Sequence, residues 1–338
     1  MKKKFLALML SALMILSLAA CGGGDDTADQ TGDGAGTEEP AGDGQTYTVG
    51  IIQQMQHVAL DAATEGFQAA LTEKLGDSVS IEFENASGDP SNYSTIANNF
   101  VSQNVDLIMA NGTSALQAAA SATSTIPILG TSITEYGVAL GIDDFTGVTG
   151  YNVSGTSDLA PLDQQAAMLQ EWFPEAQTVG LLYCSAEPNS QYQVDTVQGY
   201  LEEAGITCTQ YSFSDSNDIS AVATTACTEN DVIYVPTDNT AANNAELLGN
   251  ISLDTQTPII AGEEGICRGC GVATLTISYY DIGYATGEMA YEILVNGADP
   301  AEMEIQYAPQ FTPKYNPDMC DAFGLTPPDG YEAIEPAA

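Results

Sequence analysis

The chain has 338 residues, of which 46 are Asp or Glu and only six are Lys or Arg, so its formal net charge is −40. A surface this acidic repels nucleic acid, which excludes a nucleic-acid partner, and it offers no basic cluster for a phosphorylated ligand. Sequence patterning runs from about residue 47 to about residue 331, a length that suits two lobes better than a single core.

The first 21 residues predict export. Lys2, Lys3 and Lys4 precede an apolar run, residues 5–18, that is too short for a permanent membrane span. The following Leu18-Ala19-Ala20-Cys21 resembles the lipobox of bacterial lipoproteins, which implies removal of residues 1–20 and acylation of Cys21. The protein would then be held by lipid on the outer face of the cytoplasmic membrane, at the cell surface or in the periplasm. An ordinary secretory signal with an incidental cysteine is the alternative.

Residues 22–45 contain Gly, Asp, Thr, Glu, Ala, Pro and Gln and no large apolar side chain. Such a segment cannot bury enough surface to offset the entropy lost on ordering. We therefore expect residues 21–45 to carry the lipid attachment site and a disordered acidic tether.

From residue 47 onward, short apolar and β-branched runs alternate with segments of helical period. The predicted strands are residues 47–52, 79–83, 107–110, 126–129, 179–183, 208–213, 232–235, 259–261 and 272–277. The predicted helices are residues 59–75, 93–103, 114–123, 162–172, 191–204, 219–228, 240–250 and 281–295. This alternation is typical of parallel sheets with helices on both faces. Because the pattern closes near residue 153 and restarts at residue 179, we expect an α/β fold with two doubly wound lobes.

Beyond Cys21, the chain carries six cysteines, an even number that permits three disulfides in an exported protein. They are Cys184, Cys208, Cys227, Cys267, Cys270 and Cys320. Cys267 and Cys270 form the only close pair, and glycines surround them. A structural loop disulfide or two free thiols is favoured over redox chemistry, and with a single histidine and no second pair we expect no metal and no cofactor.

Polar residues follow the predicted strands at the edge where parallel sheets bind ligands. In the first half these residues are Gln56, His57, Asn111, Thr113, Ser114, Thr131 and Ser132. In the second half they are Ser185, Asn189, Asp238, Asn239 and Glu263. Loops of this kind facing one cleft between two lobes would form a site for a small molecule.

Several of these segments carry a family resemblance. They are Gly50–Gln53 in the first strand, His57–Ala63 and Glu65–Phe67 after it, Pro236–Thr240, and Tyr279–Tyr284. With them the chain resembles ABC-transporter substrate-binding lipoproteins of the uncharacterised sugar-type or tryptophan/tyrosine subfamily. The resemblance implies a type I periplasmic-binding-protein fold, a permease and its ATPase as partners, and an aromatic amino acid as a candidate ligand.

The same resemblance implies a hinge of three crossovers, which we expect near residues 151–153, 276–279 and 304–307. The first lobe would comprise residues 46–151 and 277–303, and the second residues 152–276 and 304–338. Closure of the lobes around a ligand is the implied mechanism.

An amino-acid ligand needs one site for its carboxylate and another for its ammonium group. We expect backbone N–H groups and hydroxyls at Thr113 and Ser114 to hold the carboxylate and Asp238 to hold the ammonium, with Asn239 beside it. Helix capping is the alternative role for Thr113, Ser114 and Asp238.

Four further candidates each have a structural alternative. His57 could contact the ligand or hydrogen-bond a neighbouring loop, and Tyr151 could be an aromatic platform or pack in the core. Asp281 could face the ligand or cap its helix. Of Tyr279 and Tyr280 at the hinge, one could face the cleft and the other the core.

Other functions fit the sequence less well. An enzyme is disfavoured because the chain has no Gly-x-Ser-x-Gly elbow, no phosphate loop and no His-rich metal motif. A surface sensor, or a binding protein for a nucleoside, sugar or peptide, remains open as an alternative. We expect a monomer with an aromatic or branched-chain amino acid as its ligand.

Overall fold

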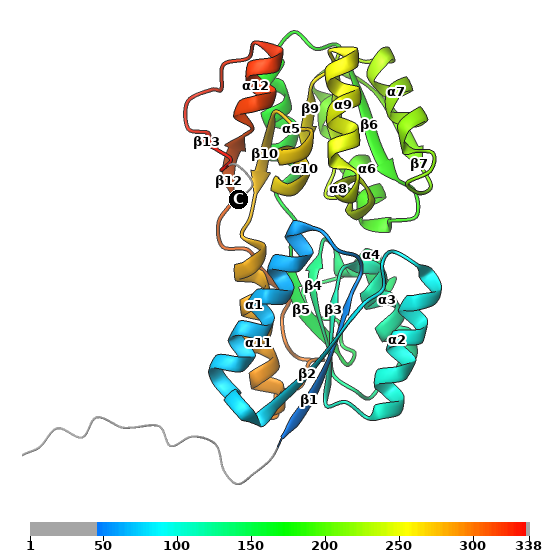
Figure 1. Ribbon diagram of the computed structural model, residues 1–338, viewed down its shortest axis with the longest axis vertical. Coiled ribbons are helices and arrows are strands. Elements are labelled where there is room, and N and C mark those ends of the chain that lie inside the picture. The colour runs from blue at the N-terminus through cyan, green and yellow to red at the C-terminus, as the bar shows by residue number, and fades with distance from the viewer. Residues whose placement is uncertain (1–45, 336–338) are drawn as a thin grey trace, which may run out of the picture. The chain divides into compact units, whose positions relative to one another are not determined.

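The computed structural model describes residues 46–335, which form two lobes that each surround one β-sheet (Figure 1). The predicted signal at residues 1–20, the lipid site Cys21 and the tether at residues 22–45 lie outside the described residues. Within residues 46–335, no helix combines the length and the apolar character needed to cross a membrane.

Lobe 1 contains a sheet with strand order β11-β5-β4-β3-β1-β2, in which every neighbouring pair is parallel. Its strands are β1 (Tyr47–Gln53), β2 (Val79–Asn85), β3 (Leu107–Asn111), β4 (Ile128–Ile133), β5 (Val153–Ser157) and β11 (Gln306–Tyr307). Its helices are α1 (Val58–Leu75), the 3₁₀ turn η1 (Gly76–Ser78), α2 (Pro90–Gln103), α3 (Thr113–Ala122), α4 (Tyr136–Leu140) and α11 (Tyr279–Leu294).

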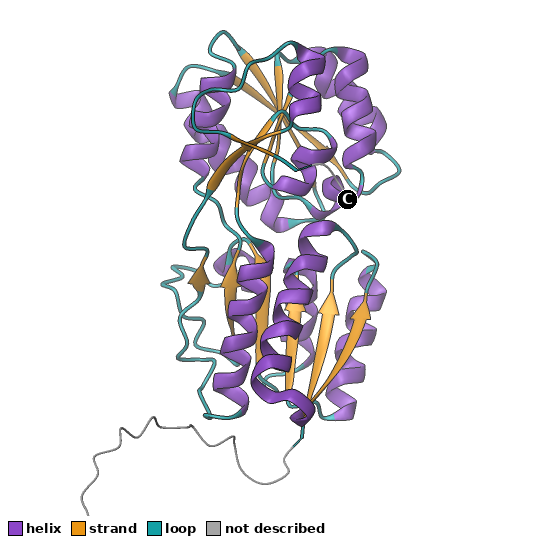
Figure 2. Ribbon diagram, turned by 60° about the vertical axis from the view of Figure 1, so that its left-hand side comes forward, coloured by secondary structure: helices purple, strands orange, loops and turns teal. Residues whose placement is uncertain are grey.

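The two faces of this sheet are covered by different helices, as Figure 2 shows for the helix pair in front of the lower sheet. Successive residues of a strand point to opposite faces. Ile51 of β1 therefore packs with Phe67 of α1 and Met289 of α11, whereas the adjacent Ile52 packs with Phe100 of α2. Burial on both faces explains the nearly continuous apolar runs of the central strands.

Lobe 2 repeats this plan with strand order β13-β12-β10-β9-β8-β6-β7, and among these pairs only β10 with β12 is antiparallel. Its strands are β6 (Thr178–Cys184), β7 (Thr207–Phe213), β8 (Val232–Val235), β9 (Ile259–Ala261), β10 (Ala273–Thr276), β12 (Thr312–Tyr315) and β13 (Glu332–Ala333). Its helices are α5 (Leu162–Trp172), α6 (Pro188–Glu203), α7 (Ile219–Glu229), α8 (Asn239–Asn243), α9 (Ala245–Thr255), α10 (Glu264–Gly269) and α12 (Pro317–Phe323). The predicted α/β fold with two doubly wound lobes is confirmed.

The chain passes between the lobes three times, at residues 158–161, 277–278 and 308–311. The second crossover lies where the sequence indicated, but the first and third differ from the expected positions. β5 pairs with β4, and β11 pairs with β5, so residues 153–157 and 306–307 belong to lobe 1. The first boundary was misplaced because β5 reads Val-Ser-Gly-Thr-Ser, a buried strand with one large apolar residue.

The helix predicted at residues 240–250 is two helices, because the chain bends at Asn244 between α8 and α9. A further short helix, α10, follows β9 and ends at the Cys267–Cys270 pair, where the sequence indicated a glycine-rich loop.

Two glycines set the distance between α1 and α11. A Cβ atom on Gly283 would lie 2.0 Å from the carbonyl oxygen of Ala63, and one on Gly66 would lie 2.1 Å from that of Tyr280. Only glycine permits so close an approach of the two backbones. This contact places Tyr279, the first residue of α11, near the start of α1, where His57 is the N-cap residue.

Candidate functional site

A small cavity lies where the carboxyl ends of strands from both lobes meet. Its volume is about 10 Å³, which is enough for roughly one water molecule. The lining residues are His57, Leu60, Ser132 and Thr134 from lobe 1, Asp158 and Tyr279 beside the crossovers, and Asn189, Thr237, Asp238, Asn239, Ala242 and Glu263 from lobe 2. A larger solute could enter this cleft only if the lobes moved apart.

Seven of the residues singled out from the sequence line this cavity: His57, Ser132, Asn189, Asp238, Asn239, Glu263 and Tyr279. They converge because each follows a parallel strand or begins a helix at the same edge of its sheet.

The other eight sequence candidates do not line this cavity. Gln56, Tyr151 and Asp281 have exposed side chains. Asn111, Thr131 and Ser185 make hydrogen bonds inside their own lobes: the Asn111 amide donates to the Leu60 carbonyl at 2.7 Å, the Thr131 hydroxyl lies 3.1 Å from that of Thr156, and the Ser185 hydroxyl donates to the Phe213 carbonyl at 3.2 Å.

Thr113 and Ser114 begin α3, and one of the N–H groups expected to hold a carboxylate there is already bound by a protein group. The side-chain oxygen Oε1 of the buried Gln54 accepts the backbone N–H of Ser114 at 3.0 Å. This corrects the sequence-based expectation, because a helix start capped within its own lobe has one fewer N–H group for a ligand.

Asp238 caps a helix, which is the structural role that the sequence left open. Its Oδ1 accepts the N–H of Ala241 at 2.8 Å, and its Oδ2 accepts the N–H of Cys184 at 2.7 Å. Burial raises the pKa of Asp238, and the negative charge of Glu187 raises it further. Both carboxylate oxygens thus already hold backbone donors.

Two more buried carboxylates cap helices near the cleft. Glu187 accepts the backbone N–H groups of Asn239 at 3.1 Å and Thr240 at 2.9 Å, at the start of α8. Glu263 accepts those of Gly265 and Ile266, at the start of α10. Burial raises the pKa of Glu263, whereas the nearby His57 lowers it. The partial positive charge of each helix start stabilises these anions.

His57 connects the two lobes. Its Nε2 lies 3.0 Å from Oδ1 of Asn239. The side-chain nitrogen of Asn239 donates to Glu187 at 2.7 Å, so the amide orientation is fixed and Oδ1 must accept. The hydrogen-bond network therefore assigns a proton to Nε2 of His57.

Asp158 is the acidic cavity residue that sequence reasoning missed. It lies on the first crossover, is 5% exposed, and accepts the hydroxyl of Tyr279 on Oδ2 at 3.0 Å. Burial raises its pKa to about 6. The available signal was its position directly after β5, at the edge of the sheet where the other candidates lie, but β5 was not recognised as a strand.

The two hinge tyrosines point to different environments. Tyr279 is buried and lines the cleft through its contact with Asp158. Tyr280 is 39% exposed and stacks on Tyr284, with ring centroids 6.4 Å apart.

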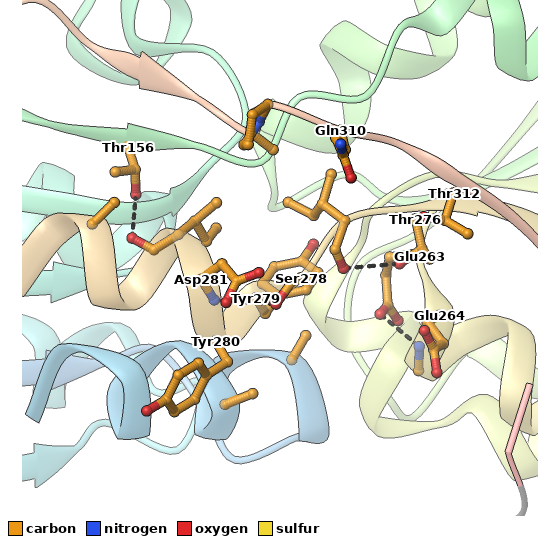
Figure 3. A pocket seen from close by; sticks show the side chains of 18 of the residues that line it. Thr156, Glu263, Glu264, Thr276, Ser278, Tyr279, Tyr280, Asp281, Gln310 and Thr312 are labelled. Carbon is orange, nitrogen blue, oxygen red and sulfur yellow. Dashed lines mark hydrogen bonds between the residues drawn. The ribbon is translucent and has the colours of Figure 1, made fainter. Parts of the chain in front are cut away.

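A second, larger cavity of about 790 Å³ lies beside the crossovers (Figure 3). Glu263 and Tyr279 are among the residues that line both cavities. On its lobe 2 side, Glu264 binds Arg268 at 2.9 Å and Lys314 at 2.7 Å. One carboxylate there is shared by two cations.

The six cysteines within residues 46–335 are all free thiols. Cys267 and Cys270 are therefore unpaired, which is one of the two alternatives expected from the sequence. Both are fully buried, and burial raises the pKa of each thiol. Between residues 46 and 335, no group of three or more His, Cys, Asp or Glu side chains is arranged to hold a metal ion.

The family model described as ABC transporter substrate binding protein matches residues 48–330. A protein named tyrosine-binding protein from Clostridioides difficile (strain R20291) is 34% identical over 297 residues, which cover 86% of this chain and 84% of the relative.

Two solved structures show the same fold. A Streptococcus pneumoniae ABC domain in complex with L-Trp is 30% identical and has a TM-score of 0.81, covering 86% of this chain and all of that one. A ligand-free, open substrate-binding protein with adhesive properties from Clostridium difficile is 34% identical with a TM-score of 0.66, covering 86% and 99%. By TM-score, the structure is more similar to the L-Trp-bound protein than to the open one.

The family model spans most of the chain, and its fold is the one described above for both lobes. This chain belongs to the ABC-transporter substrate-binding protein family.

Proposed function

We propose that this protein is the lipid-anchored, extracytoplasmic binding component of an ABC importer and that it captures an aromatic or branched-chain amino acid. The observation that carries the proposal is the cavity in which polar groups from the strand ends of both lobes meet. The tyrosine-binding relative and the structure with bound L-Trp support an aromatic ligand.

Capture would proceed by closure of the lobes. The cavity of about 10 Å³ is too small for an amino acid, so the ligand must enter while the lobes are apart. On closure, the hydrogen bond from His57 to Asn239 joins the start of α1 to the start of α8. Contacts that exist in the closed form alone favour that form.

The charges around the cleft indicate how a zwitterion would be oriented. Asp158, Asp238 and Glu263 line the cavity, and Glu187 adjoins it, so a ligand carboxylate would be repelled from the lobe 2 side. The start of α1 offers a better position, because the side chain of its N-cap residue His57 makes no capping hydrogen bond. Its first-turn N–H groups can donate hydrogen bonds to a carboxylate there, in place of the Thr113–Ser114 site.

The remaining parts of the proposal concern the assembly. Acylated Cys21 would hold a monomer at the membrane, and the segment at residues 22–45 would give the lobes reach to a permease driven by an ATPase. Metabolic labelling with radioactive palmitate in the native host, compared with a Cys21→Ala variant, tests the anchor.

A thermal-shift screen of the full chain against the twenty amino acids, four nucleosides and common sugars tests the ligand class. A ligand at 100 times its dissociation constant adds about 2.7 kcal/mol to the free energy of unfolding. We expect stabilisation by aromatic or branched-chain amino acids. A response confined to sugars or nucleosides would refute the proposed ligand class.

A further inference from the structure

Three polar atoms in the cleft have no hydrogen-bond partner in the protein: Ser132 Oγ, Asp158 Oδ1 and Asn189 Oδ1. Their residues are 6%, 5% and 4% exposed, and all three line the same cavity. Buried polar atoms are almost always hydrogen-bonded, so three unpartnered atoms in one cavity require an explanation. They come from lobe 1, from the first crossover and from lobe 2, respectively.

Two of the three atoms are fixed as acceptors by the hydrogen bonds of their own side chains, and the third, the Ser132 hydroxyl oxygen, can accept a hydrogen bond as well as donate one. Oδ2 of Asp158 is bound by the Tyr279 hydroxyl, which leaves Oδ1 free. The side-chain nitrogen of Asn189 donates to the Thr237 carbonyl at 3.1 Å, so Oδ1 is the atom without a partner.

Ser132 has a left-handed backbone with φ of 55°, next to a register shift between Gly130 and Ile133. A non-glycine residue in this conformation is strained, and such strain is concentrated at functional sites.

We propose that Ser132, Asp158 and Asn189 form a cradle for the primary ammonium group of the ligand; this rests on the proposed function and deepens it. An ammonium group has three N–H donors, and the cradle has three acceptors, one of them a carboxylate oxygen. A water molecule could bond the three atoms only with Ser132 as a donor, and it would leave the Asp158 charge unpaired. The ammonium therefore binds at Asp158 rather than at Asp238, whose oxygens hold Ala241 and Cys184.

The cradle also explains how ligand binding would close the protein. One donor group bonded to both lobes and to the crossover between them has its full set of contacts only in the closed form. The differential contacts shift the equilibrium toward closure. The ligand class that follows is a primary amine, so secondary amides and deaminated acids should not be captured.

The test is titration calorimetry on the full chain with L-tyrosine, N-acetyl-L-tyrosine, tyramine and 3-(4-hydroxyphenyl)propionate. Asp158→Asn is compared with Asp163→Asn, which makes the same charge change at an exposed position five residues along. We expect Asp158→Asn to weaken L-tyrosine binding about 10- to 100-fold and Asp163→Asn to change it less than about twofold. Ser132→Ala should weaken binding about 3- to 10-fold.

The outcomes separate the cradle from the proposed function. Equal L-tyrosine affinity of Asp158→Asn and Asp163→Asn, or undiminished binding of N-acetyl-L-tyrosine, overturns the cradle and leaves amino-acid capture intact. Capture of a different primary amine, such as lysine or tyramine alone, with loss on Asp158→Asn, supports the cradle while refuting the aromatic or branched-chain ligand. If Asp158→Asn does not fold, Ser132→Ala and the four-ligand series on the unmodified chain decide.

Discussion

The packing of α1 against α11 gives a sharp prediction for a single methyl group. In Gly283→Ala, the new Cβ would lie 2.0 Å from the Ala63 carbonyl oxygen and 2.6 Å from its carbon. Real contacts are longer than about 3 Å, so one helix must move by about 1 Å. Overpacking of this kind costs about 1–3 kcal/mol, which outweighs the gain of about 0.5–1 kcal/mol from alanine's helix propensity.

Gly199 supplies the matched control. It lies in the exposed part of α6, and a Cβ there would meet no atom within 4 Å. Gly199→Ala should therefore raise the free energy of unfolding by about 0.5–1 kcal/mol through helix propensity alone. The same substitution in two helices is expected to have opposite signs.

Urea denaturation of both variants measures the change in the free energy of unfolding. L-tyrosine titration shows whether each substitution also alters ligand binding in the cleft. Movement of α11 would displace Tyr279 and lengthen its 3.0 Å hydrogen bond to Asp158, so Gly283→Ala should also weaken ligand binding. Gly199→Ala should leave affinity unchanged. A Gly283→Ala protein as stable as the unmodified chain would show that the helix contact is looser than argued.

Two further predictions concern the buried carboxylates. Asp158 has a pKa of about 6 in the folded protein and 3.8 when unfolded, so folding favours its protonated form. The protonated carboxyl therefore adds to the unfolding free energy below pH 3.8, and this contribution is lost as the pH rises through about 6. Relative to Asp158→Asn, the unmodified chain should lose about 2 kcal/mol of unfolding free energy between pH 4 and pH 7, and pH-independent differences in urea titrations would contradict this. Asp238→Ala should lower the unfolding free energy by about 1–3 kcal/mol without ligand, because the N–H groups of Ala241 and Cys184 lose their acceptor, and an unchanged urea midpoint would count against the capping role.

The sequence predicted the strands that consist of apolar runs, and missed those that do not. All nine predicted strands occur, from β1 to β10 without β5. β5 is buried at every residue, yet four of its five residues are Ser, Gly or Thr, so neither apolar content nor alternation marks it. The short strands β11, β12 and β13 are defined by their partners rather than by their own composition.

The candidate site was predictable where a polar residue follows a recognisable strand. His57, Asp238 and Glu263 were found in this way, whereas Asp158 was missed together with β5. The carboxylate site expected at Ser114 fails for a different reason: its cap, Gln54, is 60 residues earlier in the chain. No local pattern reveals which helix starts are already satisfied by distant side chains.

The acidity of the chain explains why its binding site has this form. Lys74, Arg268 and Lys314 are the three cations outside the predicted signal; Arg268 and Lys314 line the larger cavity, and none of the three lines the small one. The protein nevertheless buries Glu187, Asp238 and Glu263 there by placing their oxygens on helix N–H groups. Backbone dipoles thus replace cations for the protein's own carboxylates.

Asp158 is the exception among these acids. No helix start caps it, the Tyr279 hydroxyl binds one of its oxygens, and the other oxygen has no hydrogen-bond partner among residues 46–335. The other acids of the site have their oxygens on backbone N–H groups, whereas Asp158 has an oxygen to which a ligand with one positive charge can bind. A captured zwitterion also carries one negative charge, so its carboxylate must lie away from these acidic side chains. The start of α1, on the opposite lobe from the capped acids, is the position that allows this separation.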